Sequence, residues 1–350
     1  MRRLFAILAL GAVAPLLPVG ALACRYNVRD VGFVDFENET YRLFVVPGPH
    51  IAPAEAERIR EAARVALKDS NVAFEIVPEE APDTHPARPH RAALPSTSLP
   101  AAVLVPTDGN TTTIPLSDAS GRVVDDLAGT FERLVDSPTR NALLASMARA
   151  FGAILLIEGT DADANAKARR TIAEAIDQIR GHMKSLPKPI EEPPGLQVLE
   201  PASLSREAVL LRTLRQDTRP TTEPRAAVFY GRGRWIGPLM RGEEIATRNL
   251  VGLFSIVGAD CECGYDLAWT LGTRLPQRWP ESLHAPVAKA LGFDPENPLI
   301  KLEIGTIVSR RGTLQATGGS RASGSANGVP APSSASSAPP VTAATPSPEA

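Results

Sequence analysis

Two cysteines separated by one residue are the most chemically reactive feature of the sequence. Cys261 and Cys263 flank Glu262. Such a pair supports three kinds of chemistry: a strained, oxidising disulfide, a two-thiolate metal clamp, or a structural disulfide in which one thiol pairs with Cys24. A closed zinc site needs four ligands, and neither cysteine nor histidine lies nearby in the sequence to complete one. We therefore favour a structural disulfide and keep redox activity and metal binding as alternatives.

A second candidate site is a cluster of basic residues at an expected hairpin turn. Arg232 and Arg234 alternate with glycines and precede Trp235. Guanidinium groups beside an indole ring can bind an anion or an acidic polysaccharide by charge and stacking. The alternative is an exposed turn whose charges only interact with water. His85 and His90 offer a weaker metal site, because they lie in a proline-rich stretch that holds them on no common face.

Composition and motif searches exclude several classes of function. The net charge of -2 and the pI near 6.3 provide no general field that attracts nucleic acid, so no nucleic-acid partner is expected. The sequence contains no nucleophile elbow, no His-Glu-x-x-His motif, no phosphate loop and no dinucleotide glycine pattern. We therefore expect no catalytic residues and no cofactor.

The N-terminus is typical of an exported protein. Two arginines precede an apolar run that ends in small residues, so residues 1–23 are predicted to be a signal peptide. Cleavage there leaves Cys24 first, where it resembles the acceptor cysteine of a bacterial lipoprotein, although Ala21 replaces the leucine or valine usual in that motif. The resemblance implies a periplasmic or membrane-anchored protein tethered through lipid at Cys24. The alternative is a soluble exported protein in which Cys24 forms a disulfide.

The elements that would position these residues occur twice in the same order. Each half is expected to contain strands around a helix, then a proline-led hairpin and a final helix. In the first half the two strands are 28–36 and 41–46, the helix is 52–67, the next strand is 72–77, the hairpin is 99–116 and the final helical sequence is 125–150. In the second half the strand is 153–158, the helix is 162–183, the next strand is 208–214, the hairpin is 223–239 and the final helix is 243–257. Proline-rich insertions occupy 78–100 and 187–201.

This order of elements resembles the thioredoxin fold, in which a proline precedes the first hairpin strand, as Pro100 and Pro224 do here. In that family a Cys-x-x-Cys pair opens the helix after the first strand of the βαβ unit, where the helix N-terminus lowers a thiol pKa. The corresponding positions here read Pro-His-Ile-Ala at 49–52 and Thr-Asp-Ala-Asp at 160–163. The resemblance therefore implies an α/β fold of two tandem, redox-silent thioredoxin-like modules that serve in binding.

The expected organisation is a signal peptide at 1–23, a first module at 24–151, a second module at 152–258, an extension at 259–310 and a tail at 311–350. The extension carries Cys261 and Cys263, a short helix around 282–291 and an apolar strand at 299–308. The Gly/Ser/Ala/Pro-rich tail is expected to be disordered, because it has almost no large apolar side chains. We expect a non-catalytic binding or scaffold component of the cell envelope with an envelope protein as partner. The alternative is a thiol-disulfide or metal-handling protein that acts through Cys261 and Cys263.

Overall fold

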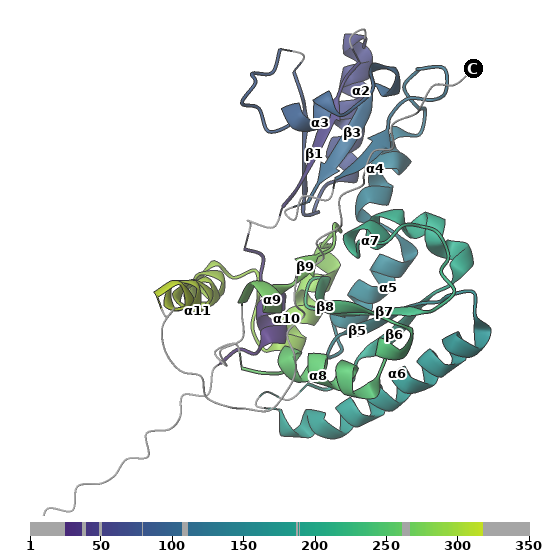
Figure 1. Cartoon of the computed structure of the whole chain (residues 1–350). Helices are drawn as coiled ribbons and strands as arrows, with labels where there is room; N and C mark the ends of the chain where they lie inside the picture. Colours follow the sequence, from purple (N-terminus) through teal and green to yellow (C-terminus); the bar gives the residue numbers. More distant parts are fainter. Residues whose placement is uncertain are drawn as a thin grey trace, which may run out of the picture.

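The protein has an α/β fold with two mixed sheets, as the sequence predicts. The computed structural model describes residues 25–36, 40–48, 51–78, 80–106, 111–186, 188, 190–260 and 267–317. Figure 1 shows two lobes, one around each sheet. The first lobe holds a four-stranded sheet in the order β2-β1-β3-β4, and the second a five-stranded sheet in the order β6-β5-β7-β8-β9. The first four strands of each sheet therefore follow one scheme.

The first sheet is built from a parallel pair and an antiparallel hairpin. Its strands are β1 (Tyr41–Val46), β2 (Val72–Ile76), β3 (Ala101–Val105) and β4 (Thr112–Pro115). β1 pairs with β2 in parallel and with β3 in antiparallel, and β3 pairs with β4 in antiparallel. The hairpin is the one expected from the sequence.

Both faces of the first sheet are covered. On one face, α2 (Pro53–Ala66) and α4 (Leu127–Val135) bury an apolar core against β1 and β3. On the other face lies the proline-rich insertion, which contains α3 (Arg88–Ala92) and the 3₁₀ turn η1 (Ser96–Ser98). Phe44 and Val46 of β1 pack there against Val77, Ala81 and Ala87. The insertion is thus a packed layer of the first lobe, because burying these side chains requires a cover.

The second sheet repeats the pattern and adds one strand. Its strands are β5 (Ala153–Ile157), β6 (Gly195–Leu199), β7 (Arg225–Tyr230), β8 (Arg234–Arg241) and β9 (Thr273–Arg274). β5 pairs in parallel with β6 and in antiparallel with β7, whereas β8 is antiparallel to both β7 and β9. All residues of β5 and β7 are buried, as expected of central strands covered on both faces.

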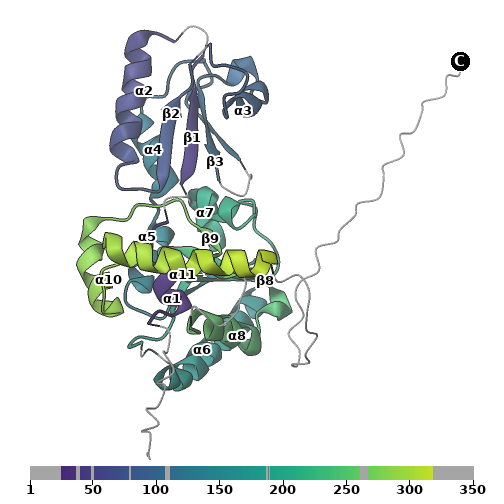
Figure 2. The same cartoon turned by 90° about the vertical axis from the view of Figure 1, so that its left-hand side faces the viewer.

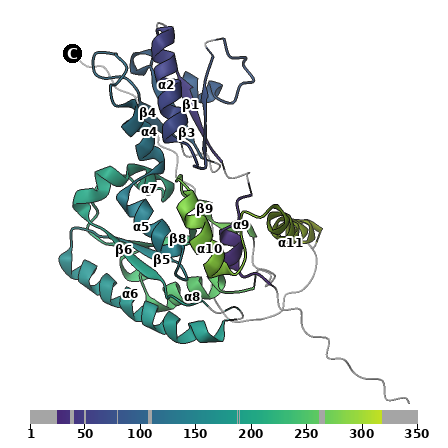
Figure 3. The same ribbon diagram turned by 180° about the vertical axis from the view of Figure 1, so that it is seen from behind.

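Helices cover both faces of this sheet. One face holds α6 (Ala162–His182) and α8 (Thr247–Val257). The Asp161 carboxylate caps α6 by accepting hydrogen bonds from the main chain of Asp163 and Ala164. The opposite face holds α5 (Pro138–Met147), α7 (Ala208–Thr213) and α10 (His284–Leu291). Figure 3 shows that α4 and α5 follow one another from the first lobe to the second.

The helical sequence predicted at 125–150 forms two helices in the structure. α4 ends at Val135 and α5 begins at Pro138, with Ser137 as its N-cap. A proline favours the first turn of a helix and cannot continue a preceding one, so the break falls there.

Three predicted strands are helices in the structure. Residues 28–32 form α1 (Val28–Gly32), which begins at a capping box between Asn27 and Asp30. The predicted strand 208–214 is α7, and the parallel strand next to β5 is instead β6, within the predicted insertion 187–201. The predicted strand 299–308 belongs to α11 (Pro298–Thr317), which also extends into the region expected to be disordered from residue 311 onward. Ile304 of α11 is buried against α1 and its neighbours, and Figure 2 shows the helix lying across the second lobe.

Candidate functional site

A short segment of the C-terminal extension connects the two lobes. We call residues 274–279, which follow α9 (Leu267–Leu271), the clasp. Towards the first lobe, the Tyr41 hydroxyl donates to the Arg274 carbonyl at 2.7 Å and the Trp279 main chain donates to the Asp69 carbonyl at 2.8 Å. Towards the second lobe, the Leu275 main chain donates to the Gly233 carbonyl at 2.9 Å. The main chain of the clasp is thus hydrogen-bonded to both lobes.

Arg140 fixes the clasp to the break between α4 and α5. Its side chain is 2 % exposed, and the guanidinium donates to the carbonyl oxygens of Leu134 and Pro276 at 2.7 and 2.6 Å, and to those of Arg133 and Asp136 at 2.7 and 2.8 Å. Burial lowers its pKa to about 10. One cation therefore satisfies carbonyls at the end of α4, in the α4–α5 connection and in the clasp.

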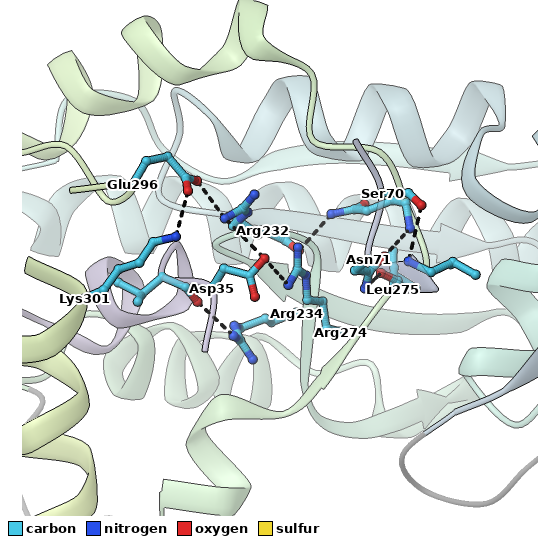
Figure 4. A network of polar contacts seen from close by, with 12 residues as sticks. Asp35, Ser70, Asn71, Arg232, Arg234, Arg274, Leu275, Glu296 and Lys301 are labelled. Carbon is cyan, nitrogen blue, oxygen red and sulfur yellow. Dashed lines mark hydrogen bonds and ion pairs between the residues drawn. The ribbon is translucent and has the colours of Figure 1, made fainter. Parts of the chain in front are cut away.

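Beside the clasp lies a chain of alternating charges, shown in Figure 4. Lys301 of α11 lies 2.9 Å from Glu296, and Glu296 lies 2.8 Å from the Arg232 guanidinium. Arg232 also lies 3.7 Å from Asp35, which lies 3.2 Å from Arg274 of the clasp. These residues come from four separate segments of the chain, so the network joins the N-terminal segment, the β7–β8 turn, β9 and α11.

Arg232 is the centre of this network. The residue is 5 % exposed, and its guanidinium lies 4.3 Å from the centre of the Trp279 ring. Burial and the nearby Arg274 guanidinium lower its pKa to about 10, against the opposing effects of Glu296 and Asp35. At neutral pH Arg232 is thus a buried cation held by two carboxylates and an aromatic face.

The turn that carries Arg232 and Arg234 is buried, contrary to the exposed turn expected from the sequence. Arg234 is 0 % exposed, and its guanidinium donates to the carbonyl oxygens of Gly32, Val34 and Leu271 at 3.0, 3.3 and 3.3 Å. Trp235 is half-buried and packs against the core on the α5 side of the second sheet. The two arginines already bind carbonyl and carboxylate groups of this chain, so they act here as structural cations. Anion binding at the turn stays a prediction, and it would require an anion to displace these contacts.

Cys24, Cys261 and Cys263 lie outside the described residues, but their neighbours in the sequence are placed. Asn27 and Asp260 form an isolated antiparallel bridge, and the Val28 main chain donates to the Ala259 carbonyl at 3.0 Å. The segments that lead to the three cysteines therefore start from adjacent positions.

The two histidines are part of the cover of the first sheet. His85 Nε2 lies 2.9 Å from a Glu75 carboxylate oxygen, and its Nδ1 accepts a hydrogen bond from the Ala87 main chain. His90 stacks on Phe44 with the ring centres 6.0 Å apart. Among the described residues, no group of three or more His, Cys, Asp or Glu side chains is placed to hold a metal ion.

A small pocket opens where the two lobes meet. It is lined by Tyr41, Thr112, Arg212 and Thr273 among others, and its volume of about 20 Å³ holds about one water molecule. Within the described ranges, no helix is both long and apolar enough to cross a membrane.

Sequence reasoning identified Arg232 and Arg234 but missed their partners. Asp35, Arg274 and Glu296 are single charges in unrelated segments, and no spacing in the sequence connects them. It also missed Arg225, which follows Pro224 at the start of a buried strand, where a charged residue is unusual. A scan against models of protein families and a search of curated proteins found no match for the chain.

Proposed function

We propose that this protein is a binding or scaffold component of the cell envelope that presents two α/β lobes in a fixed relation. The observation that carries the proposal is the clasp, whose main chain is hydrogen-bonded to both lobes. The buried Arg140 and the charge network support the same contacts at two further points. A fixed relation between two lobes is what a scaffold needs in order to hold partners at a set distance.

We further infer that each lobe is a redox-silent thioredoxin-like module. The shared strand order and directions of the two sheets, and the position of Pro100 before β3 and Pro224 before β7, support this inference. The helix that follows β5 begins at an aspartate cap instead of a thiol. Export through residues 1–23 is part of the proposal, as is an envelope protein as partner. Cys24 then carries lipid or forms a disulfide.

In-cell photo-crosslinking tests the scaffold function. The full chain, with its own leader, carries a photo-crosslinking amino acid either at exposed Val65 in α2 or at exposed Asp177 in α6. A scaffold is expected to give defined adducts in the envelope fraction from both lobes. Asn71→Ala weakens the clasp and should reduce these adducts, whereas the exposed Asn141→Ala should leave them unchanged.

Two results contradict the proposal. One is a chain that stays outside the envelope fraction and yields no adduct from either lobe. The other is turnover by the purified protein in a thiol oxidase or reductase assay that Cys261→Ser abolishes, which would favour thiol chemistry at Cys261 and Cys263.

A further inference from the structure

Buried arginines are frequent in the described residues, and nearly all of them have anionic or carbonyl partners. Six are at most 5 % exposed: Arg29, Arg140, Arg225, Arg232, Arg234 and Arg274. Arg232 and Arg274 contact carboxylates. Arg29, Arg140 and Arg234 donate to main-chain carbonyls. This is the usual behaviour, because removing a cation from water is costly unless it is paired.

Arg225 differs from the other five. It is 3 % exposed, and its Nη1 donates at 2.9 Å to the side-chain oxygen of Gln216, which is uncharged. Its Nε and Nη2 are both buried and have no hydrogen-bond partner among the described residues. These two N–H groups lie along one edge of the guanidinium and point in parallel, which is the geometry that binds both oxygens of a carboxylate.

The surroundings of Arg225 add positive charge. Arg241, the last residue of β8, is its direct cross-strand partner. Burial and Arg241 lower the pKa of Arg225, and Asp217 opposes them only in part. On the other side, Arg225 pairs with Ile157 of β5, which brings an apolar neighbour. Asp217 thus acts on the guanidinium electrostatically, but no carboxylate among the described residues forms an ion pair with it, so a directly bound anion would be stabilising.

We propose that the paired Nε and Nη2 groups of Arg225 form a binding site for a small carboxylate. The site lies at the end of the second sheet where β7 begins, next in the chain to the loop 217–223, whose residues are exposed. The C-terminal end of this loop is fixed, because the Thr160 and Asp161 main chains donate hydrogen bonds to the carbonyl oxygens of Thr221 and Thr222. In this proposal a small ligand reaches the buried N–H groups when the exposed residues around Asp217 move aside. This site is independent of the scaffold function proposed above.

Thermal unfolding of the full chain in acetate and in chloride, at equal ionic strength and pH 7, tests the site. Ligand that binds only the folded state raises Tm, and we expect acetate to raise it by roughly 2 °C or more relative to chloride. Arg225→Lys keeps the charge but loses the parallel N–H pair, so the acetate effect should disappear. Arg206→Lys, at an exposed position, is the matched control and should keep it.

A second variant supplies the anion from within the chain. Gln216→Glu places a carboxylate where the glutamine oxygen now accepts from Arg225. We expect it to raise Tm in chloride and to reduce the acetate effect, whereas Gln178→Glu, exposed on α6, should do neither. Equal Tm in acetate and chloride for the wild type overturns the proposal, as does an acetate effect that persists in Arg225→Lys. Should Arg225→Lys fail to fold, an unchanged acetate effect in Gln216→Glu overturns it instead.

Discussion

Asn71 and Gln277 hold the clasp to the first lobe by hydrogen bonds in both directions. The Asn71 main chain donates to the Gln277 carbonyl at 3.3 Å, and the Gln277 main chain donates to the Asn71 side-chain oxygen at 2.9 Å. The Asn71 side-chain nitrogen also donates to the Leu275 carbonyl at 3.0 Å. Gln277 in turn donates from its side chain to the Arg232 carbonyl at 2.8 Å, so one pair of residues links both lobes.

Replacing Asn71 by alanine should destabilise the whole protein. The substitution removes two buried side-chain hydrogen bonds and leaves their partners in the clasp unsatisfied, so we expect a loss of about 2–4 kcal/mol in the free energy of unfolding. Urea denaturation followed by circular dichroism measures it. Asn141→Ala removes an exposed side-chain hydrogen bond to Asp136 and should change stability by less than about 0.5 kcal/mol. Equal effects of the two substitutions would show that the clasp does not stabilise the fold.

Arg140→Met should be the most damaging single substitution of an arginine in this region. It removes donors from four carbonyls, of which those of Leu134 and Pro276 have buried contacts with the guanidinium. We expect a loss of about 3–5 kcal/mol, because carbonyls at the end of α4 and in the clasp lose their partner together. Arg170→Met on the exposed face of α6 is the control for removing a charge. A loss in Arg140→Met as small as in the control would contradict the role given to Arg140.

The elements with strong local signals could be predicted from the sequence. α6 has an aspartate cap and apolar residues Ala168, Ile172, Ala175 and Ile179 at helical spacing, and it was predicted almost to the residue. Both hairpins follow from a proline, an apolar strand and a glycine-containing turn. In these elements the local preference and the tertiary packing favour the same conformation.

The wrong predictions share a different cause. Residues 28–32 and 208–213 are segments of only five and six residues, too short for their apolar positions to distinguish a helix from a strand. Other contacts decide them: the local capping box between Asn27 and Asp30 starts α1, whereas tertiary packing of Leu210, Leu211 and Leu214 under the second sheet selects α7. The site was only half predictable for a similar reason. Arg232 and Arg234 are adjacent in sequence, whereas Asp35 and Glu296 reach them only through the fold.

The charge network should make stability depend on acidic pH through Glu296. Burial raises the pKa of this carboxyl, but Arg232 and Lys301 lower it by more, so its pKa in the folded protein lies below the usual value. A depressed folded-state pKa stabilises the protein above the unfolded-state pKa, and this contribution is lost as pH falls through the folded-state pKa. At pH 7 the Glu296→Gln protein should therefore have a free energy of unfolding about 1–3 kcal/mol below that of the wild type. Between pH 7 and pH 3 its free energy of unfolding should fall by less than that of the wild type.

Denaturation series at several pH values measure this difference. Glu281→Gln, at an exposed position near α10, is the matched control and should follow the wild-type curve. A Glu296→Gln curve parallel to that of the wild type would mean that Glu296 does not couple the network to pH.

The cysteines should form one disulfide in the exported protein. They lie outside the described residues, but Cys24 is three residues before Asn27, and Cys261 directly follows Asp260, to which Asn27 is paired. Three extended residues span at most about 10 Å, so the chain lengths on either side of the Asn27–Asp260 bridge permit Cys24 to pair with either of the other two cysteines. Intact mass of the protein recovered from the envelope, measured before and after reduction, should show a gain of two hydrogens.

Peptide mapping then identifies the pair: a bridge from Cys24 closes a long loop, and its loss in Cys24→Ser should destabilise the chain by up to about 5 kcal/mol. A lipid-sized mass on Cys24 would instead leave Cys261 and Cys263 to pair with each other. Three free thiols in the exported protein would contradict both arrangements.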